Sequence, residues 1–239
     1  MDDRLLGLSE DNLSQRYATW RTSALGSITE RVEIAAVFDL LGPIEGKRLL
    51  DAGCGDGVYS VEAARRGARV TGLDLSEDML NEARKRSHAA GVTVDWQPGD
   101  VLRLPYPDGS FDIVAAITLL CLVPDPGAAI SEMTRVLAPG GRLVLGDLHR
   151  WSLVAAKRRI RGWSGNEFWR GAHFWTAKEI LSLMARAGLK PGRRRGAAYF
   201  PPSGIAARIL GPVDPLFSGL GTLGAAFLVV EGIKPPALQ

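Results

Sequence analysis

The feature that most constrains the fold of this chain is an alternation of short apolar runs with helix-like segments after about residue 46. Short apolar runs that end in glycine or an acid predict buried strands, and apolar residues at three- and four-residue spacing predict helices. Strands that alternate with helices favour a parallel sheet with helices on both faces. We expect the strands at residues 48–52, 69–76, 92–97, 111–119, 142–148, 189–200 and 223–231.

Capping residues place several of the helices between these strands. Ser76 is the predicted N-cap of a helix that ends at Gly91, and Thr176 is the predicted N-cap of the helix that follows it to about residue 188. A further helix is expected within residues 125–141, and residues 10–42 have the pattern of amphipathic helices that lead into the sheet.

The length of 239 residues suits one large α/β domain with a small appendage. We expect a helical leader or cap over residues 1–42 and the main domain over residues 43–239. A basic, tryptophan-bearing insertion at residues 148–175 interrupts the alternation of strands and helices.

The composition indicates a globular protein in a reducing compartment. Hydrophobic residues make up 46% and charged residues 23% of the chain, which is enough apolar material for a core. Two cysteines suggest no disulfide framework. The acidic N-terminus does not have the pattern of a signal peptide, and the longest uncharged stretch near the C-terminus is too short to cross a bilayer. We therefore expect a cytoplasmic protein without a transmembrane segment.

A glycine turn, "LLDAGCGDG" at residues 49–57, directly follows the first expected strand. In open α/β sheets, ligands bind beyond the carboxyl ends of the strands. The turn is therefore in the place where a ligand should lie close to the backbone.

The residues around this turn restrict the ligand. A phosphate-binding loop needs Lys followed by Ser or Thr after its last glycine, but the chain continues with Val58 and Tyr59. A dinucleotide fingerprint needs G-x-G-x-x-G, whereas the spacing here is G-x-G-x-G. Asp51 and Asp56, on either side of the turn, are expected to repel a pyrophosphate and to suit a ligand with an ammonium group.

A third acid adds a requirement for ribose hydroxyls. Asp74 ends the second expected strand, 23 residues after Asp51. An acid in this place can accept hydrogen bonds from the hydroxyls of a ribose. A nucleoside with free hydroxyls, no phosphate and a cationic tail meets all these requirements, and S-adenosylmethionine is such a ligand.

The sequence resembles the class I S-adenosylmethionine-dependent methyltransferases, within them the methyltransferase type 11 group related to quinone-biosynthesis methyltransferases. This resemblance implies a Rossmann-like, seven-stranded, mostly parallel sheet with helices on both faces and an antiparallel last strand. It covers about 100 residues in four ordered blocks: "LLDAGCGDG" (49–57), "VTGLDLSEDML" (70–80), "GDVLRLPYPDGSFDIV" (99–114) and "LVPDPGAAISEMTRVLAPGGRLVL" (122–145).

The resemblance also implies roles for individual residues in binding S-adenosylmethionine. The glycines of the turn would let the backbone approach the methionine part, and the acids would hold its amino group, the ribose and the adenine amino group. No metal ion is implied. The matching cofactor-binding residues are Asp51, Gly53, Gly55, Asp74, Leu75 (beside the adenine), Asp100, Val101 (through its backbone N–H) and Thr118 (beside the methionine part).

The chain departs from many relatives just before "VPD", where they have histidines and this sequence has Cys121 and Leu122. Cys121 is expected to be a small buried residue.

Methyl transfer by in-line displacement needs mainly alignment, and a general base only for a protonated acceptor. The catalytic residue stays unassigned, and the candidates for a base are His149, Tyr17 and His173.

We expect a small-molecule acceptor, recognised by the insertion at residues 148–175 and the segment at residues 200–222. An alternative is a methyltransferase that acts on a membrane lipid or RNA through the basic residues 150–195, which carry twelve Lys or Arg against two Glu. A non-catalytic cofactor-binding protein is a further alternative. No nucleic-acid partner is expected because the chain has no recognised RNA-binding module, whereas peripheral membrane contact and the oligomeric state stay open.

Overall fold

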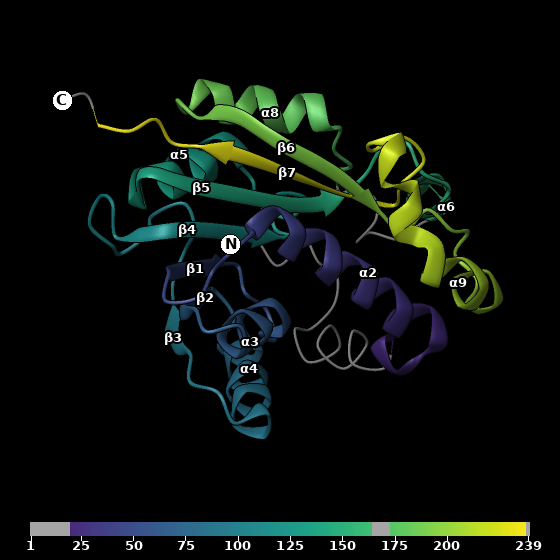
Figure 1. The fold of residues 1–239 in the computed structure, drawn as a ribbon, viewed down its shortest axis with the longest axis horizontal. Coiled ribbons are helices and arrows are strands. Elements are labelled where there is room, and N and C mark those ends of the chain that lie inside the picture. The colour runs from purple at the N-terminus through teal and green to yellow at the C-terminus, as the bar shows by residue number, and fades with distance from the viewer. Residues whose placement is uncertain (1–19, 164–172, 238–239) are drawn as a thin grey trace.

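The computed structural model describes residues 20–163 and 173–237 (Figure 1). Its centre is a seven-stranded sheet in the order β3-β2-β1-β4-β5-β7-β6. The strands are β1 (Arg48–Ala52), β2 (Arg69–Asp74), β3 (Asp95–Pro98), β4 (Phe111–Ile117), β5 (Leu137–Leu148), β6 (Lys190–Ala197) and β7 (Phe227–Ile233). The helices are α2 (Ala24–Leu41), α3 (Val58–Arg65), α4 (Glu77–Ala90), α5 (Pro126–Val136), α6 (Leu153–Trp163), α8 (Ala177–Arg186), α9 (Gly204–Leu210) and the 3-10 helix η2 (Gly211–Leu220).

The sheet confirms the expected Rossmann-like architecture. Strands β1, β2, β3, β4 and β5 pair in parallel, and β7 pairs antiparallel with both β5 and β6. The last strand is therefore the antiparallel one, and the strand order reverses between β1 and β4. The turn after β1 lies at this reversal, where the loops that follow β1 and β4 diverge and leave room for a ligand.

Two apolar cores lie on opposite faces of the sheet. On one face, α5 and α8 pack against side chains such as Leu50, Val114 and Leu145. On the other face, α2 and α3 pack against Leu49 and Val144, the alternate residues of the same strands. This alternation follows from the two-residue side-chain period of a strand, and it makes each central strand apolar on both sides.

The capping residues act as predicted. The Ser76 hydroxyl accepts a hydrogen bond from the Met79 N–H, and Gly91 ends α4 in the left-handed conformation. Thr176 begins α8 with a reciprocal capping box, in which its hydroxyl accepts from the Glu179 N–H and the Glu179 carboxylate accepts from the Thr176 N–H.

Some element boundaries differ from the expectation. The helix expected within residues 125–141 ends at Val136, and β5 begins at Leu137, which pairs with Phe111. Pro139 explains the early end, because a proline disfavours helical backbone at the residue before it. Strand β3 begins only at Asp95, and β7 begins at Phe227 rather than at residue 223.

The insertion after β5 and the segment between β6 and β7 meet at the carboxyl ends of the parallel strands, at the right of Figure 1. Val154 from α6 and Leu210 from α9 pack against a small core formed by Ala198, Phe200, Ala207 and Ala226. Among the described residues, no helix has the length and apolar character needed to cross a membrane.

Trp96 of β3 is packed across two glycines that come from different parts of the chain. A Cβ atom added to Gly72 of β2 would lie 2.4 Å from Cζ3 of Trp96, and one added to Gly57 would lie 2.6 Å from its Cη2. The indole Nε1 donates to the Ser87 hydroxyl at 3.3 Å, which fixes the ring against α4. Gly72 lacks a side chain because the indole ring fills the space that one would need.

We predict that Gly72→Ala lowers the free energy of unfolding by about 1–3 kcal/mol through overpacking. Urea unfolding of four proteins tests this: the unmodified chain, Gly72→Ala, Trp96→Ala and the double variant. The cost of the added methyl group should largely disappear in the Trp96→Ala background. An equal cost in both backgrounds would show that the indole is not the cause.

Candidate functional site

The glycine turn follows β1 with three left-handed residues. Gly53, Gly55 and Gly57 have φ angles of 72°, 53° and 79°, in a region of backbone conformation that residues with a side chain rarely adopt. The space beside Gly55 is open, since an added Cβ would meet no atom within 4 Å. A Cβ at Gly53 would lie 2.5 Å from Cδ1 of Leu119, and Gly57 packs against Trp96 and Ala83. Gly55 therefore offers exposed backbone to a ligand, whereas Gly57 serves packing.

The Asp74 carboxylate connects the turn to the end of β2. Its Oδ2 accepts a hydrogen bond from the Gly55 N–H at 2.8 Å, and its Oδ1 accepts one from the Ser76 N–H at 3.0 Å. Each carboxylate oxygen can accept more than one hydrogen bond. Asp74 thus orders both loops and keeps acceptor capacity for hydroxyl groups of a ligand.

Asp51 lies in β1, directly below the turn, and is almost fully buried. Its Oδ2 accepts from the Ser60 hydroxyl at 2.6 Å. Burial raises the pKa of Asp51 to about 6, the Ser60 hydrogen bond opposes this shift, and the charge of Asp74 adds to it. A carboxylate in such a place is stabilised by a cation, and an ammonium group of a ligand would supply one.

Asp56 does not have the effect on a ligand that the sequence suggested. Its carboxylate forms ion pairs with Arg21 and, at 2.7 Å, with Arg86 of α4. The Arg86 Nε also donates to the Asp56 carbonyl at 2.9 Å. These hydrogen bonds and charges hold the pKa of Asp56 below its usual range despite burial. The expectation that Asp56 repels a pyrophosphate is therefore wrong, because two guanidinium groups compensate its charge; the role of Asp56 is to fix the turn against α4.

The residues expected beside the adenine lie at the neighbouring strand ends. Leu75 follows Asp74 and is 53% exposed, so its apolar side chain is open to contact with a ligand. Asp100 is exposed, and its Oδ1 accepts from the Leu102 N–H at 2.9 Å. Val101 is buried beside it. This side of the site thus combines an uncovered apolar side chain with an acid.

Thr118 ends β4 in a strained conformation, with a φ of 56°. Its N–H donates to the Gly146 carbonyl at 2.7 Å, and its carbonyl lies 3.7 Å from Sγ of Cys121. Strain of this kind collects at functional sites, where the surrounding structure enforces it. Cys121 is buried, as expected for a small apolar residue.

Asp147, near the end of β5, helps to hold the loop after β4. It is completely buried, and its oxygens accept from the Cys121 N–H at 3.1 Å and the Leu148 N–H at 2.7 Å. Burial raises the pKa of Asp147 to about 7, against the effect of these hydrogen bonds. Asp147 thus links the ends of β4 and β5.

The candidate bases have different surroundings. His149 is buried, and its Nδ1 lies 3.1 Å from the Ala225 carbonyl, so Nδ1 carries the proton and Nε2 is left as the acceptor. Burial lowers the pKa of His149. The Nε2 of His173 is instead 3.2 Å from the Arg150 guanidinium, which can only donate, and its ring lies against that of Trp175 at an angle of 57°. Tyr17 lies outside the described residues.

Sequence reasoning missed Ser60 and Asp147. Ser60 is the third residue of α3, which begins directly after the turn, and no motif marks a lone serine in a helix as the partner of a buried acid. Asp147 had a visible signal, because it is an acid at the end of the apolar run "RLVLGDL", and the carboxyl ends of parallel strands meet at one edge.

These residues form a site that fits S-adenosylmethionine. The turn offers open space beside Gly55, Asp51 offers a buried carboxylate with no ion pair among residues 20–163 and 173–237, and Asp74 offers acceptors beside the exposed Leu75. Within the described part of the chain, no three His, Cys, Asp or Glu side chains form a group that could hold a metal ion.

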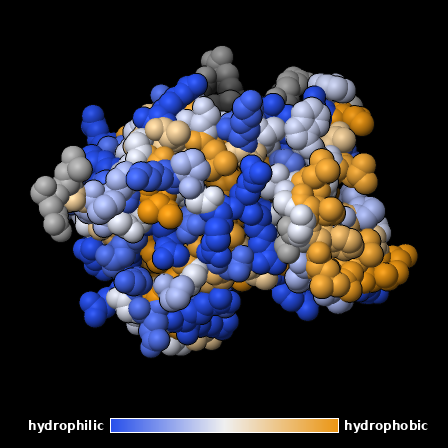
Figure 2. All heavy atoms as spheres, turned by 45° about the horizontal axis from the view of Figure 1, so that its top comes forward, coloured by the Kyte–Doolittle hydropathy of each residue, from blue (hydrophilic) through white to orange (hydrophobic). Residues whose placement is uncertain are grey.

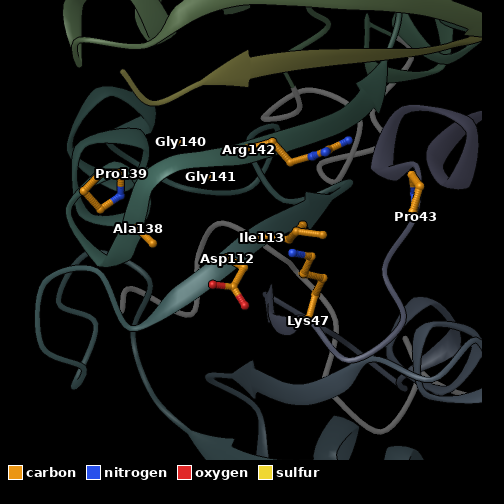
Figure 3. Close-up of a pocket in the computed structure, with 9 residues that line it drawn as sticks. All are labelled: Pro43, Lys47, Asp112, Ile113, Ala138, Pro139, Gly140, Gly141 and Arg142. Atoms are coloured by element: carbon orange, nitrogen blue, oxygen red, sulfur yellow. The ribbon is translucent and has the colours of Figure 1, made fainter. Parts of the chain in front are cut away.

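A separate small pocket of about 190 Å³ lies at the opposite end of the strands (Figure 3). Its lining includes Lys47 and Asp112, at the starts of β1 and β4, and Arg142, where β5 pairs with β4. It does not contribute to the site, because the glycine turn follows the other end of β1.

Comparisons with known proteins agree with this site. A family model described as "Methyltransferase domain" matches residues 50–145. A ubiquinone biosynthesis O-methyltransferase from Ralstonia nicotianae is 36% identical over an alignment of 173 residues, and the match covers 68% of this chain and 71% of the relative. A relative of the same name from Bordetella avium is 33% identical, and the match covers 69% of this chain and 71% of the relative. Another from Marinobacter nauticus is 32% identical, with 74% of each chain covered.

Solved structures show the same fold. A SAM-dependent methyltransferase from Thermotoga maritima, described as a possible histamine N-methyltransferase, has a TM-score of 0.73 at 25% identity, with 94% of this chain and 97% of that chain covered. The [4+2]-cyclase SpnF has a TM-score of 0.65 at 24% identity, over 85% and 80% of the two chains. The second likeness shows the fold alone, so the activity rests on the relatives and the site. The chain belongs to the class I S-adenosylmethionine-dependent methyltransferases.

Proposed function

We propose that the protein is an O-methyltransferase that transfers a methyl group from S-adenosylmethionine to a phenolic hydroxyl on a small ring compound, a precursor of a quinone. The similarity of about two thirds of the chain to ubiquinone biosynthesis O-methyltransferases carries this proposal. A methoxy group on such a ring arises by methylation of a ring hydroxyl, which makes the phenol the group to be aligned.

The cofactor supplies a methyl group on a positively charged sulfur, which is already reactive toward a nucleophile. The chain then has to hold the two reactants in line, and the residues around the turn support this role. We assign Asp51 to the amino group, Asp74 to the ribose hydroxyls, and Gly53 and Gly55 to close backbone contact. Leu75, Asp100 and Val101 would contact the adenine, and Thr118 would lie beside the methionine part.

A phenol reacts far better as a phenolate, so a base that takes its proton would raise the rate. We propose His149 as this base. Its Nδ1–H is engaged with the Ala225 carbonyl, and its burial favours the neutral imidazole, so Nε2 is ready to accept a proton. The ring follows β5, at the same edge of the sheet as the glycine turn. His173 is a weaker candidate because its Nε2 faces Arg150.

The assignment of Asp74 predicts a large loss of cofactor affinity in Asp74→Ala. Loss of its hydrogen bonds to ribose should weaken binding of S-adenosylhomocysteine by roughly 2–4 kcal/mol, which is about 30- to 800-fold. Calorimetry with Asp78→Ala, which removes an exposed acid from the first turn of α4, gives the matched control. Unchanged affinity in a folded Asp74→Ala protein would contradict the assignment.

The surroundings of Asp51 predict that cofactor binding depends on pH. The pKa of Asp51 is raised to about 6, so the carboxyl group gains its proton as the pH falls through this value. The protonated group cannot pair with the ammonium of the ligand, which stays charged throughout this range. Affinity for S-adenosylhomocysteine, measured between pH 5 and 8, should therefore be lower on the acidic side.

Asp51→Asn should bind more weakly at pH 8 and lose this pH step. A step of the same size in Asp51→Asn would assign the pH dependence to another group.

The proposed reaction is tested by release of S-adenosylhomocysteine with catechols, simple phenols, amines and thiols as acceptors. We expect methyl ethers from catechol-type rings. Methylation of amines or thiols alone would overturn the proposal for oxygen while leaving the membership of the family intact.

For His149→Gln we expect kcat to fall by about 10²- to 10⁴-fold. The affinity for S-adenosylhomocysteine should not change, and kcat/KM for the acceptor, measured with S-adenosylmethionine saturating at every pH, should lose the fall on its acidic side. His88→Gln, which changes an exposed histidine of α4, should behave like the unmodified protein. A pH profile that keeps its acidic limb in His149→Gln would exclude this histidine as the base.

A further inference from the structure

An unusual number of large apolar side chains is exposed at one corner of the molecule. Of the thirteen such side chains that are exposed in the described residues, ten belong to residues 151–163 and 201–224. Figure 2 shows apolar side chains gathered at the right, over this corner. We name this surface the apolar corner; its residues are Trp151, Leu153, Ile160, Trp163, Ile205, Ile209, Val213, Leu216, Leu220 and Leu223.

The apolar corner is built on well-anchored elements. Helix α9 turns Ala207 inward and leaves Ile205 and Ile209, one helical turn apart, 73% and 67% exposed. In η2, the buried Asp214 carboxylate accepts from the N–H groups of Ala198 and Tyr199, at 3.2 and 2.7 Å. Leu216, two residues later, is 80% exposed. The outward direction of these side chains is therefore set by the fold.

The charges at this corner have one sign. Residues 151–163 contain four Lys or Arg and no acid, and residues 201–224 contain only Arg208 and the buried Asp214. The Arg159 guanidinium lies 5.9 Å from the ring of Trp163, so a basic group and an exposed indole occur together. Exposed tryptophan and leucine side chains interspersed with bases, and without exposed acids, have the chemistry of a surface that binds anionic lipids.

The corner also lies at the edge of the sheet that carries the cofactor site. Helix α6 follows β5 after a short link, and α9 with η2 connects β6 to β7 (Figure 1). Both segments begin where strands that run parallel to β1 end, which is the edge occupied by the glycine turn. A surface bound there would lie beside the region where an acceptor has to enter.

We propose that the apolar corner docks the enzyme on an anionic phospholipid bilayer. The aliphatic and indole side chains would enter the interface, and Lys157, Arg159 and Arg208 would meet the phosphate groups. An apolar acceptor dissolved in the bilayer could then reach the site without crossing water. This last step rests on the proposed function, whereas the docking itself does not.

A bilayer explains the corner better than a second copy of the chain. Two apolar corners facing each other would bring their basic side chains together without acids to compensate them. An anionic surface neutralises the same charges, and it needs no matching shape for side chains that project as far as Leu216 and Trp163.

The test is sedimentation of the full chain with vesicles of phosphatidylcholine alone and of phosphatidylcholine with phosphatidylglycerol, without S-adenosylmethionine. We expect binding to the anionic vesicles. The triple variant Ile205→Ser, Ile209→Ser, Leu216→Ser should bind these vesicles at least about tenfold more weakly. Ile233→Ser, an exposed apolar residue at the end of β7, gives the matched control.

The charge contribution is tested separately with two double variants. One is Lys157→Glu with Arg159→Glu, and the control is Lys85→Glu with Arg69→Glu, which changes exposed bases elsewhere. Only the first pair should reduce binding. Unchanged vesicle binding in the apolar triple variant would overturn the proposal. So would analytical ultracentrifugation that shows a dimer of the unmodified protein and a monomer of the triple variant.

Methyl transfer to a water-soluble catechol separates the proposed membrane docking from the proposed function, because this reaction needs no bilayer. If the triple variant keeps that activity and loses vesicle binding, docking is supported. If neither protein methylates a catechol but both docking results hold, only the proposed acceptor is wrong.

Discussion

The structure of the site depends on one carboxylate that joins two loops. Asp74 accepts from the backbone N–H groups of Gly55 and Ser76, so the turn after β1 and the start of α4 keep a fixed separation. Asp56 holds the same turn from the other side through Arg86. Two acids that look alike in the sequence thus have different tasks: one presents its oxygens at the site, and the other is neutralised by guanidinium groups.

Buried acids recur at the carboxyl ends of the central strands. Asp51 is the second-to-last residue of β1 and lies close to a hydroxyl, and Asp147 is the second-to-last residue of β5 and lies beside backbone N–H groups. Burial raises the pKa of both, which makes each carboxylate sensitive to a nearby cation. A site built from such groups favours a positively charged ligand, and this agrees with the sulfonium and ammonium groups of S-adenosylmethionine.

The fold could be predicted well because its signals are local. The strand runs, the caps at Ser76 and Thr176, and the glycine turn are each contained in a few residues. The end of α5 was less predictable, since pairing of Leu137 with Phe111 competes with helix formation there. The hydrogen bond of Ser60 to Asp51 and the neutralisation of Asp56 could not be predicted, because each depends on which side chains the fold brings into contact. The place of Asp147 at the end of an apolar run was visible in the sequence, but its hydrogen bonds to the N–H groups of Cys121 and Leu148 were not.

The sequence by itself determined the parallel order of strands and helices, the place of the glycine turn and the preference for a cofactor without phosphate. The order and the place of the turn follow from side-chain periodicity. The preference for a cofactor without phosphate follows from the glycine spacing and from Asp51 and Asp74, since Asp56 is neutralised by Arg21 and Arg86. Only the tertiary structure decided which acids face the site, which nitrogen of His149 carries the proton, and that ten large apolar side chains point outward at one corner. The reason is physical: charge compensation, hydrogen-bond partners and burial are properties of neighbours in space, and the order of residues along the chain does not specify them locally.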